Sequence, residues 1–192
     1  MADPQPVRHT RGGVRHTAAA HYRRTAPACV VNLLDATASC RTLLVEGPAG
    51  PGRDAVLAEL SDAGFTVLRP PRELDRLDPA RSYRELLDTP GRIALDGGPL
   101  RELVYGPLRR GRARVTWIEA LDFADAVAER DGALVHVPGA DPAEGASSGE
   151  EAAAQHAYER AATTLAQHLP LVTVASGECA AQDGRTALST PG

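Results

Sequence analysis

The sequence predicts one α/β domain whose centre is a parallel β-sheet flanked by helices. Two observations carry this prediction: short apolar runs recur along the chain, each bounded by glycine or proline, and helical patterns separate most of them. Runs that are apolar at every position are typical of strands buried on both faces, as in parallel sheets covered by helices. With 192 residues, the chain is long enough for one domain with a sizeable core.

Five apolar runs next to glycine or proline are the expected strands, at 42–46, 65–68, 92–96, 133–137 and 171–175. Four stretches with apolar residues at helical spacing, or rich in alanine, are the expected helices, at 53–63, 99–109, 116–130 and 150–168. Gly64 and Gly111 are expected to end the first two of these helices. Residues 27–40 predict either a short strand or a helix, and the charged stretch 73–87 has only weak periodicity.

The domain itself is expected to span residues 27–177. Residues 1–26 contain five arginines and one acid, a formal charge of +4, which leaves about −8 for the rest of a chain whose total is −4. We expect this basic arm to be disordered. Binding of nucleic acid by the arm is the alternative, but the acidic body offers no second basic face for it. Residues 178–192 predict a flexible tail.

The composition indicates the cellular compartment and whether the chain crosses a membrane. The three cysteines, Cys29, Cys40 and Cys179, are widely spaced, which is typical of reduced thiols rather than of a disulfide framework. No run of about 18 apolar residues is present, so we expect no membrane-spanning helix. No apolar segment follows the N-terminal arginines, so we expect no secretory signal. These observations predict a cytoplasmic protein with no membrane partner; they leave the oligomeric state open, a homodimer included.

The first expected strand runs directly into Gly-Pro-Ala-Gly-Pro-Gly-Arg-Asp. The spacing of Gly47, Gly50, Gly52, Arg53 and Asp54 is that of the phosphate-binding loop G-x-x-x-x-G-K-[ST] with its last two positions changed. In such a loop, backbone N–H groups and the N-terminus of the following helix face the phosphates. The three glycines are therefore candidate phosphate-binding residues, and the whole segment predicts a nucleotide site.

The two changed positions allow more than one interpretation. Arg53 can keep the positive charge of the motif's lysine, or it can be a solvated residue of the first helical turn. Asp54 replaces the hydroxyl that binds Mg²⁺; it can bind the metal itself, or it can stabilise the helix dipole. All 21 basic residues of the chain are arginine, a bias that genome composition explains, so no lysine elsewhere can replace the missing one. The glycines can also form an ordinary tight turn.

A second motif follows the third expected strand, which ends in Asp96. Together with the glycine loop it resembles the thymidylate-kinase-like branch of the P-loop nucleotide kinases, and within it the small deoxynucleotide and deoxynucleoside kinases. Their segment reads h-L-S-E-x-V-Y-G-P-x-x-R-G, and the matching residues here are Leu100, Glu102, Val104, Tyr105, Gly106, Pro107, Arg110 and Gly111. The resemblance covers about residues 41–175. It implies a three-layer P-loop NTPase fold and transfer of the γ-phosphoryl group of ATP to a nucleoside or nucleotide, with Mg²⁺ as the metal.

The resemblance also implies roles for individual residues. Asp96 matches the acid that binds Mg²⁺ or accepts the proton of the attacking hydroxyl; a cap of the following helix is the alternative. Arg53 occupies the position of the phosphate-binding lysine. Glu102 and Tyr105 lie three residues apart on one helical face and are expected near the acceptor, with a half-buried tyrosine packed beside the sheet as the alternative. Arg110 is expected to face a phosphate, with a solvated turn as the alternative. The implied metal ligands are Asp54 and Asp96.

The chain departs from the family pattern at the phosphates. Gly97 stands where the family has a phosphate-binding arginine, and the stretch 139–157, which matches the mobile lid, contains no arginine. Arginine contacts with the transferring group are worth about 10³–10⁵ in rate in related enzymes. A catalytically inactive pseudokinase that binds a nucleotide or a partner is therefore the alternative to an active kinase. His136 is expected to be a core residue rather than a catalyst.

Overall fold

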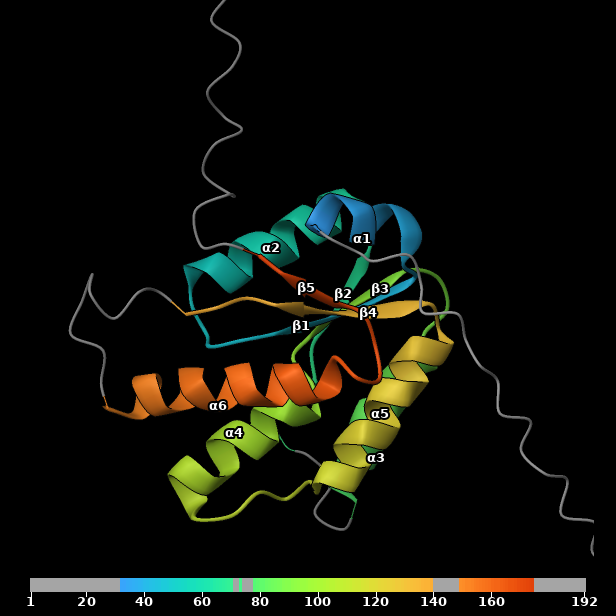
Figure 1. The fold of residues 1–192 in the computed structure, drawn as a ribbon. Coiled ribbons are helices and arrows are strands. Elements are labelled where there is room, and N and C mark those ends of the chain that lie inside the picture. The colour runs from blue at the N-terminus through green and yellow to red at the C-terminus, as the bar shows by residue number, and fades with distance from the viewer. Residues whose placement is uncertain (1–31, 71–72, 74–77, 140–148, 175–192) are drawn as a thin grey trace, which may run out of the picture.

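The structure is a computed structural model, and it describes residues 32–70, 73, 78–139 and 149–174. The predicted arm at 1–26 and the predicted tail at 178–192 lie outside the described residues, as do Cys29 and Cys179. Figure 1 shows three layers: a central sheet, helices α1 and α2 on one face, and helices α3 to α6 on the other. The predicted α/β architecture is confirmed.

The sheet has five parallel strands in the order β2-β3-β1-β4-β5. The strands are β1 (Thr42–Glu46), β2 (Thr66–Leu68), β3 (Ile93–Asp96), β4 (Gly132–His136) and β5 (Leu171–Thr173). The helices are α1 (Leu33–Ser39), α2 (Pro51–Asp62), α3 (Pro79–Leu87), α4 (Pro99–Arg110), α5 (Trp117–Glu129) and α6 (Gly149–Leu165). All five predicted strands are present, within two residues of their expected ends.

The helix boundaries differ from the prediction where local capping decides them. Helix α2 begins at Pro51 rather than at 53, because proline fits the first helical position, where an N–H group has no intrahelical acceptor. Helix α3 forms in the weakly periodic stretch: the side chain of Asp78 accepts a hydrogen bond from the N–H of Arg81, and Pro79 starts the helix. Helix α6 ends at Leu165, before the predicted 168, and the open alternative at residues 27–40 resolves as helix α1.

The strand register brings the carboxyl ends of the three central strands together. Strand β1 pairs with both neighbours, with Val45 opposite Asp96 of β3 and Glu46 opposite His136 of β4. We call this edge of the sheet, where Glu46, Asp96 and His136 end their strands, the carboxyl rim. Ligands of open α/β sheets bind beyond this edge.

Alternation along the strands assigns each rim residue to one face of the sheet. Leu44 of β1 packs in the core under α3 to α6, so Glu46, two residues further, lies on that face. Ala94 of β3 packs in the core under α1 and α2, so Asp96 lies on the α2 face. Within the described residues, no helix is long and apolar enough to cross a membrane.

Candidate functional site

The loop between β1 and α2 passes close to the end of β4. Gly47 has φ +155°, and a Cβ atom at this position would overlap the carbonyl oxygen of Val137. A Cβ on Gly52 would lie 3.8 Å from Val137 Cγ1, and one on Gly50 would meet nothing within 4 Å. Of the three predicted loop glycines, Gly47 is thus the one that the backbone packing requires. The loop therefore meets the segment after β4 at the carboxyl rim.

The N-terminus of α2 presents few but well-placed donors. The N–H groups of a first helical turn have no intrahelical acceptor. At the start of α2, Pro51 has no N–H, and the N–H of Asp54 donates to the carbonyl of Gly50 at 3.2 Å. Within the described residues, the N–H groups of Gly52 and Arg53 have no backbone acceptor, so both are available to a ligand. Together with the positive end of the helix dipole they form a local environment that favours an anion.

Arg53 is buried beside this loop, with 6% of its surface exposed. Its Nη1 donates to the carbonyl oxygen of Gly47 at 3.2 Å, and its Nη2 lies 3.2 Å from Oδ1 of Asp96. The alternative of a solvated first-turn arginine is therefore wrong. The guanidinium connects the start of the loop to the end of β3, and its charge stays at the carboxyl rim.

Asp96 holds a second arginine that the sequence did not reveal. Arg69, which follows β2, donates from Nε to Oδ2 of Asp96 at 2.9 Å, although its side chain is 73% exposed. The two guanidinium groups thus face one carboxylate. The signal that could have indicated Arg69 is its position just after a strand, because the carboxyl ends of parallel strands share one edge.

Glu46 is a second carboxyl group at the carboxyl rim, and it is fully buried. Its Oε1 accepts a hydrogen bond from the N–H of Gly98 at 2.8 Å. Burial raises the pKa of Glu46 to about 8, although the Gly98 hydrogen bond and the charge of Arg53 oppose the shift. This group therefore keeps its proton at neutral pH. Sequence reasoning missed it because it ends a strand that is otherwise an apolar run; a glutamate directly before Gly47 was the available signal.

Several buried polar atoms around the loop have no hydrogen-bond partner. Within the described residues these atoms are Glu46 Oε2, Arg53 Nε, Asp96 Oδ1, His136 Nε2 and the Tyr158 hydroxyl oxygen. The 3.2 Å approach to Asp96 Oδ1 is thus an ion pair without hydrogen-bond geometry. Buried polar groups in native proteins are nearly always paired, so a cluster of unpaired ones points to a ligand or ordered water.

His136 and Tyr158, like Glu46, lie on the α6 side of the sheet. His136 is buried, as predicted for a core residue, and burial lowers its pKa. The phenol of Tyr158 on α6 is fully buried, and burial raises its pKa. Both groups are therefore uncharged at neutral pH, and each offers a hydrogen-bonding atom to the space beside Glu46.

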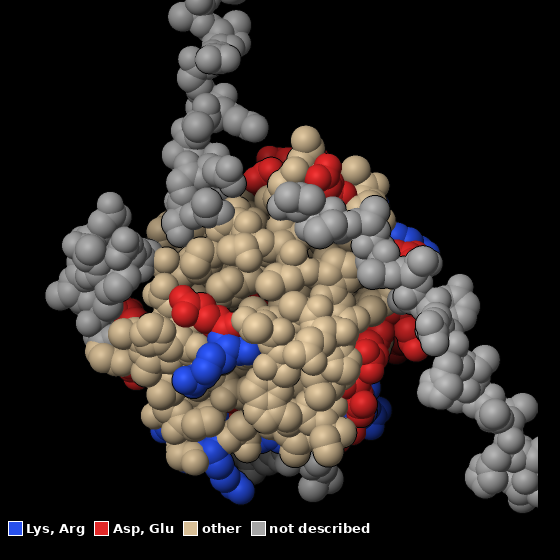
Figure 2. Space-filling view, viewed as in Figure 1, with Lys and Arg blue, Asp and Glu red and all other residues tan. Residues whose placement is uncertain are grey.

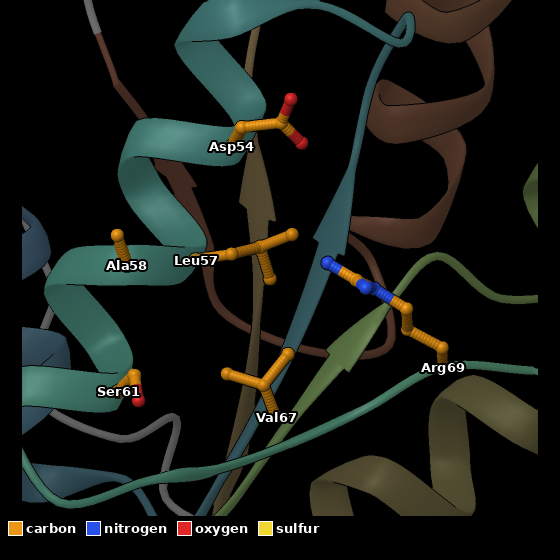
Figure 3. A pocket seen from close by; sticks show the side chains of 6 residues that line it. All are labelled: Asp54, Leu57, Ala58, Ser61, Val67 and Arg69. Carbon is orange, nitrogen blue, oxygen red and sulfur yellow. The ribbon is translucent and has the colours of Figure 1, made fainter.

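Asp54 faces an open groove rather than the carboxyl rim. The groove runs between α2 and β2, and Figure 3 shows the Asp54 carboxylate on one wall and the Arg69 guanidinium extending toward α2 from the other. The lining residues are Asp54, Leu57, Ala58, Ser61, Val67 and Arg69. The side chain of Asp54 is exposed, as a residue that stabilises a helix dipole would be.

The predicted Mg²⁺ ligands do not form a metal site as they stand. Asp96 has a guanidinium nitrogen within 3.2 Å of one oxygen and within 2.9 Å of the other. In the described part of the chain, no group of three or more His, Cys, Asp or Glu residues could hold a metal ion. A role for Asp54 and Asp96 in binding Mg²⁺ stays a prediction that this arrangement does not support.

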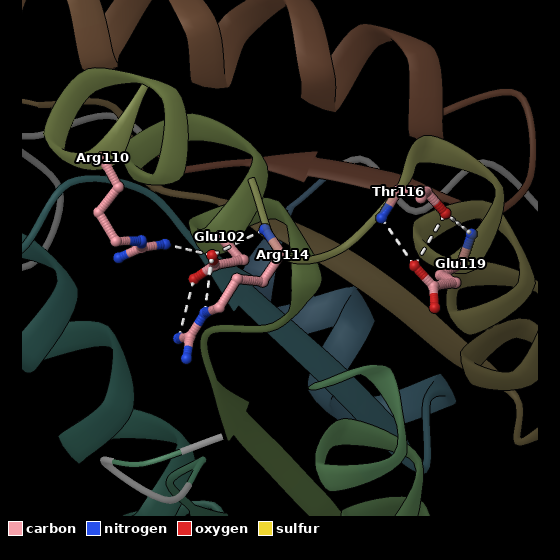
Figure 4. Close-up of polar contacts among 5 residues, drawn as sticks. All are labelled: Glu102, Arg110, Arg114, Thr116 and Glu119. Carbon is pink, nitrogen blue, oxygen red and sulfur yellow. Dashed lines mark hydrogen bonds and ion pairs between the residues drawn. The ribbon is translucent and has the colours of Figure 1, made fainter. Parts of the chain in front are cut away.

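The predicted acceptor residues lie in a separate cluster on α4. Glu102 forms ion pairs with Arg110 and Arg114, and it also accepts a hydrogen bond from the backbone N–H of Arg114 at 3.0 Å (Figure 4). Burial alone would raise the pKa of Glu102, but hydrogen bonds from Arg114 and Arg110 outweigh it and lower the pKa. In this arrangement Glu102 and Arg110 bind each other, and their predicted contact with a substrate would require these bonds to open.

Tyr105 lies between the two regions. It is half-buried, and its ring meets that of Tyr158 edge to face, with the centroids 6.0 Å apart. The guanidinium carbon of Arg109 lies 4.4 Å from the Tyr105 ring centroid, and Arg109 pairs with Glu150 of α6 at 2.8 Å. These contacts fix α4 against α6 and leave Tyr105 beside the buried cluster.

The charged side chains form no continuous basic surface on the face drawn in Figure 2. Arginine and acidic side chains lie there in small separate groups on a largely uncharged surface. This face therefore gives no support to a nucleic-acid partner, which the acidic body of the chain also disfavours.

Comparison with known proteins supports the fold. No protein-family model and no curated protein sequence matches this chain. Among solved structures, the YorR protein of Bacillus subtilis, in complex with phosphorylated GDP, matches with a TM-score of 0.60 at 16% sequence identity. The match covers 71% of this chain and 86% of YorR. This chain has a P-loop kinase-like fold. The thymidylate-kinase-like branch is a finer assignment that stays a prediction.

Proposed function

We propose that this protein binds a nucleotide by its phosphates at the loop of residues 47–54 and belongs functionally with the nucleoside and nucleotide kinases. The observation that carries the proposal is the buried guanidinium of Arg53 inside a glycine loop, at the N-terminus of α2. An anion is the ligand that this combination of helix terminus and cation favours. A nucleotide bound to a structural neighbour of the same fold supports the choice of anion.

The charges of the carboxyl rim agree with a phosphate ligand. Arg53 and Arg69 together carry two positive charges against the single carboxylate of Asp96. Glu46 adds no charge at neutral pH, because burial raises its pKa to about 8. The rim therefore keeps a net positive charge for the phosphates, and the unpaired atoms of Glu46, His136 and Tyr158 offer hydrogen bonds to the rest of the ligand.

As a kinase, the protein would transfer the γ-phosphoryl group of ATP to a nucleoside or nucleotide. Asp96 would accept the proton of the attacking hydroxyl, and Arg53 would hold the phosphates. Tyr105, together with Glu102 and Arg110 once their mutual bonds open, would lie near the acceptor. The family's Mg²⁺ would neutralise phosphate charge, although the carboxylates of this chain do not form its site as they stand.

A nucleotide-binding protein without turnover is the second candidate. The ion pairs of Asp96 favour it, since both carboxylate oxygens face guanidinium groups and must leave them before Asp96 can take a proton. The replacement of the loop's lysine and hydroxyl by Arg53 and Asp54 points the same way. Such a protein would act as a regulatory module whose bound nucleotide or partner is the signal.

Calorimetry with ATP and with GTP, each with and without Mg²⁺, tests the binding proposal. The test variant is Gly47→Ala, which forces the loop away from Val137; the matched control is Gly149→Ala, where a Cβ meets nothing within 4 Å. We expect binding to the wild type and the control, and loss of binding in Gly47→Ala. Absence of heat and of a thermal shift in the wild type at millimolar nucleotide would rule out both candidates.

Turnover then separates the two candidates. Release of ADP from ATP is followed across a panel of nucleosides and nucleoside monophosphates with the wild-type protein. ADP release that depends on one acceptor identifies a kinase. Tight nucleotide binding with no acceptor-dependent release identifies the binding module.

A further inference from the structure

The turn between β3 and α4 consists of two glycines, one favoured by its backbone conformation and the other by close packing. Gly97 has φ +87°, a left-handed conformation that favours glycine. A Cβ on Gly98 would lie 2.9 Å from Leu44 Cδ1 and 3.1 Å from Glu46 Oε1. The two residues that follow Asp96 can therefore offer only backbone groups, and no side chain, to a ligand at the carboxyl rim.

Arg101, in the first turn of α4, covers this bare turn. Its Cδ lies 3.8 Å from the position that a Cβ on Gly97 would occupy, so the side chain extends back over the turn. Helical side chains point toward the N-terminus of their helix, which explains the direction. The family pattern has arginine at the position of Gly97 and serine at that of Arg101, so this chain lacks a cation at one position and has one at the other.

The positive charge of Arg101 acts on three buried side chains at or beside the carboxyl rim. Its positive charge is among the interactions that favour ionisation of Glu46, Tyr83 and Tyr158, against the effect of burial on each pKa. These groups come from β1, α3 and α6, so Arg101 lies where these three elements approach one another. Glu46 Oε2 and the Tyr158 hydroxyl, which lack partners among the described residues, belong to the same space.

Arg101 differs from the other arginines of this region in having no acidic partner among the described residues. Arg53 and Arg69 pair with Asp96, and Arg110 and Arg114 pair with Glu102. Arg101 is exposed, and the ion pairs and side-chain hydrogen bonds seen in the described part of the chain do not include it. An exposed arginine alone would be an ordinary solvated residue, but this one extends over the Gly97 turn. Its charge also acts on Glu46 and Tyr158, which have buried atoms without a hydrogen-bond partner among the described residues.

We propose that Arg101 binds a phosphate group of the bound nucleotide, supplying from α4 the cation that the Gly97–Gly98 turn lacks. The inference rests on the proposed function, because it needs a nucleotide at the carboxyl rim. A guanidinium binds phosphate oxygens through two parallel hydrogen bonds. Arg101 would thus complete a set of three arginines from α2, the end of β2 and α4 around the phosphates.

Calorimetry with ATP and with inorganic tripolyphosphate tests this role in the full chain. The variants are Arg101→Ala and Arg101→Lys; the control is Arg41→Ala, an exposed arginine just before β1, at the opposite end of the strands. Loss of a charge-assisted contact should weaken the binding of both ligands by Arg101→Ala about 10- to 100-fold. Arg101→Lys should recover part of this loss, and Arg41→Ala should bind as the wild type does.

Each result has one meaning. If the wild type binds neither ligand, the proposed function fails before the role of Arg101 is in question. If the wild type binds and Arg101→Ala binds equally well, Arg101 is not a phosphate ligand. If Arg101→Ala lowers the unliganded melting temperature and the lysine variant recovers no affinity, Arg101 is structural, and the inference is overturned.

Discussion

Asp96 and Glu102 each form ion pairs with two arginines, yet their surroundings differ in how completely the polar groups are paired. Asp96 Oδ1, and polar atoms of Glu46, His136 and Tyr158 on the other face of the sheet, are buried and lack hydrogen-bond partners in the described part of the chain. Around Glu102, both carboxylate oxygens accept hydrogen bonds from arginine. The first region has unused hydrogen-bonding capacity, whereas the carboxylate in the second is fully paired.

The difference shows that an arginine–carboxylate pair by itself does not identify a binding site. Glu102 connects α4 to the loop before α5, where Thr116 and Glu119 form a capping box (Figure 4). Asp96 instead connects the end of β3 to Arg53 of α2 and to Arg69 after β2. Four substitutions test the comparison, and they follow from the largest expected effect to the smallest.

Asp96→Asn should have the largest effect, on turnover. If Asp96 is the proton acceptor, acceptor-dependent ADP release should fall about 10²–10⁴-fold. The Kd for ATP should not increase, because the substitution frees Arg53 and Arg69 from their counter-ion. Steady-state rates and calorimetry measure the two effects. An unchanged rate would remove Asp96 from the mechanism and make the two clusters equivalent.

Glu102→Gln should instead affect the stability. Removing a largely buried charge from two arginines should lower the free energy of unfolding by about 3 kcal/mol, measured by urea denaturation. Glu85→Gln is the control, because the Arg81–Glu85 pair is exposed, at 67% and 58%, and such pairs contribute about 0.5 kcal/mol or less. Nucleotide affinity should be unchanged in Glu102→Gln. A weaker affinity with normal stability would make Glu102 a ligand residue after all.

Glu46→Gln should change how stability depends on pH. The unfolded chain loses this proton near pH 4.5 and the folded chain near pH 8, so the free energy of unfolding falls as pH rises through this range. The glutamine variant should lack a fall of about 2 kcal/mol between pH 5 and 7. His136 has the opposite sign, because burial lowers its pKa and stability is lost as pH falls below 6.5. Denaturation at several pH values measures both, and a pH profile that Glu46→Gln leaves unchanged would mean that Glu46 is ionised in the folded protein.

The double substitution of Arg53→Lys with Asp54→Thr should give the smallest effect. It restores the ordinary end of the phosphate loop, so affinity for ATP should increase about tenfold. Calorimetry with and without Mg²⁺ measures the change, and Arg53→Lys alone separates the two positions. Weaker binding would show that the arginine is adapted to its ligand rather than a decayed lysine.

Much of the fold follows from local patterns in the sequence. The strand ending at Asp96 and the helix from Pro99 could be predicted because an apolar run, two glycines and a helical pattern follow one another. Helix α3 was less visible because its apolar residues are interspersed with charged ones, although Asp78 and Pro79 form a recognisable start. The sequence alone does not show that residues such as Tyr83 are buried, because they are covered only when α3 packs on the sheet.

The site was only partly predictable. The glycine loop and Asp96 are sequence motifs, whereas the pairing of Asp96 with Arg69 depends on the strand order, which brings β2 beside β3. Glu46 could not be recognised as a buried, protonated acid, because burial at the end of β1 is a property of the assembled layers. The predicted contact of Glu102 with a substrate is not supported, since Arg110 of the same helix and Arg114 of the following loop already pair with its carboxylate.

The central position of β1 has a consequence for synthesis of the chain. Residue Thr42 pairs with Ile93 on one side and with Gly132 on the other, so both neighbours of β1 leave the ribosome long after it does. Until then the apolar strand has no neighbouring strand to pair with, a state in which nascent chains are prone to aggregate. The loop after β1 also takes its shape from Val137. A chain interrupted before β4 would contain every residue of the phosphate loop and still lack the loop's native form.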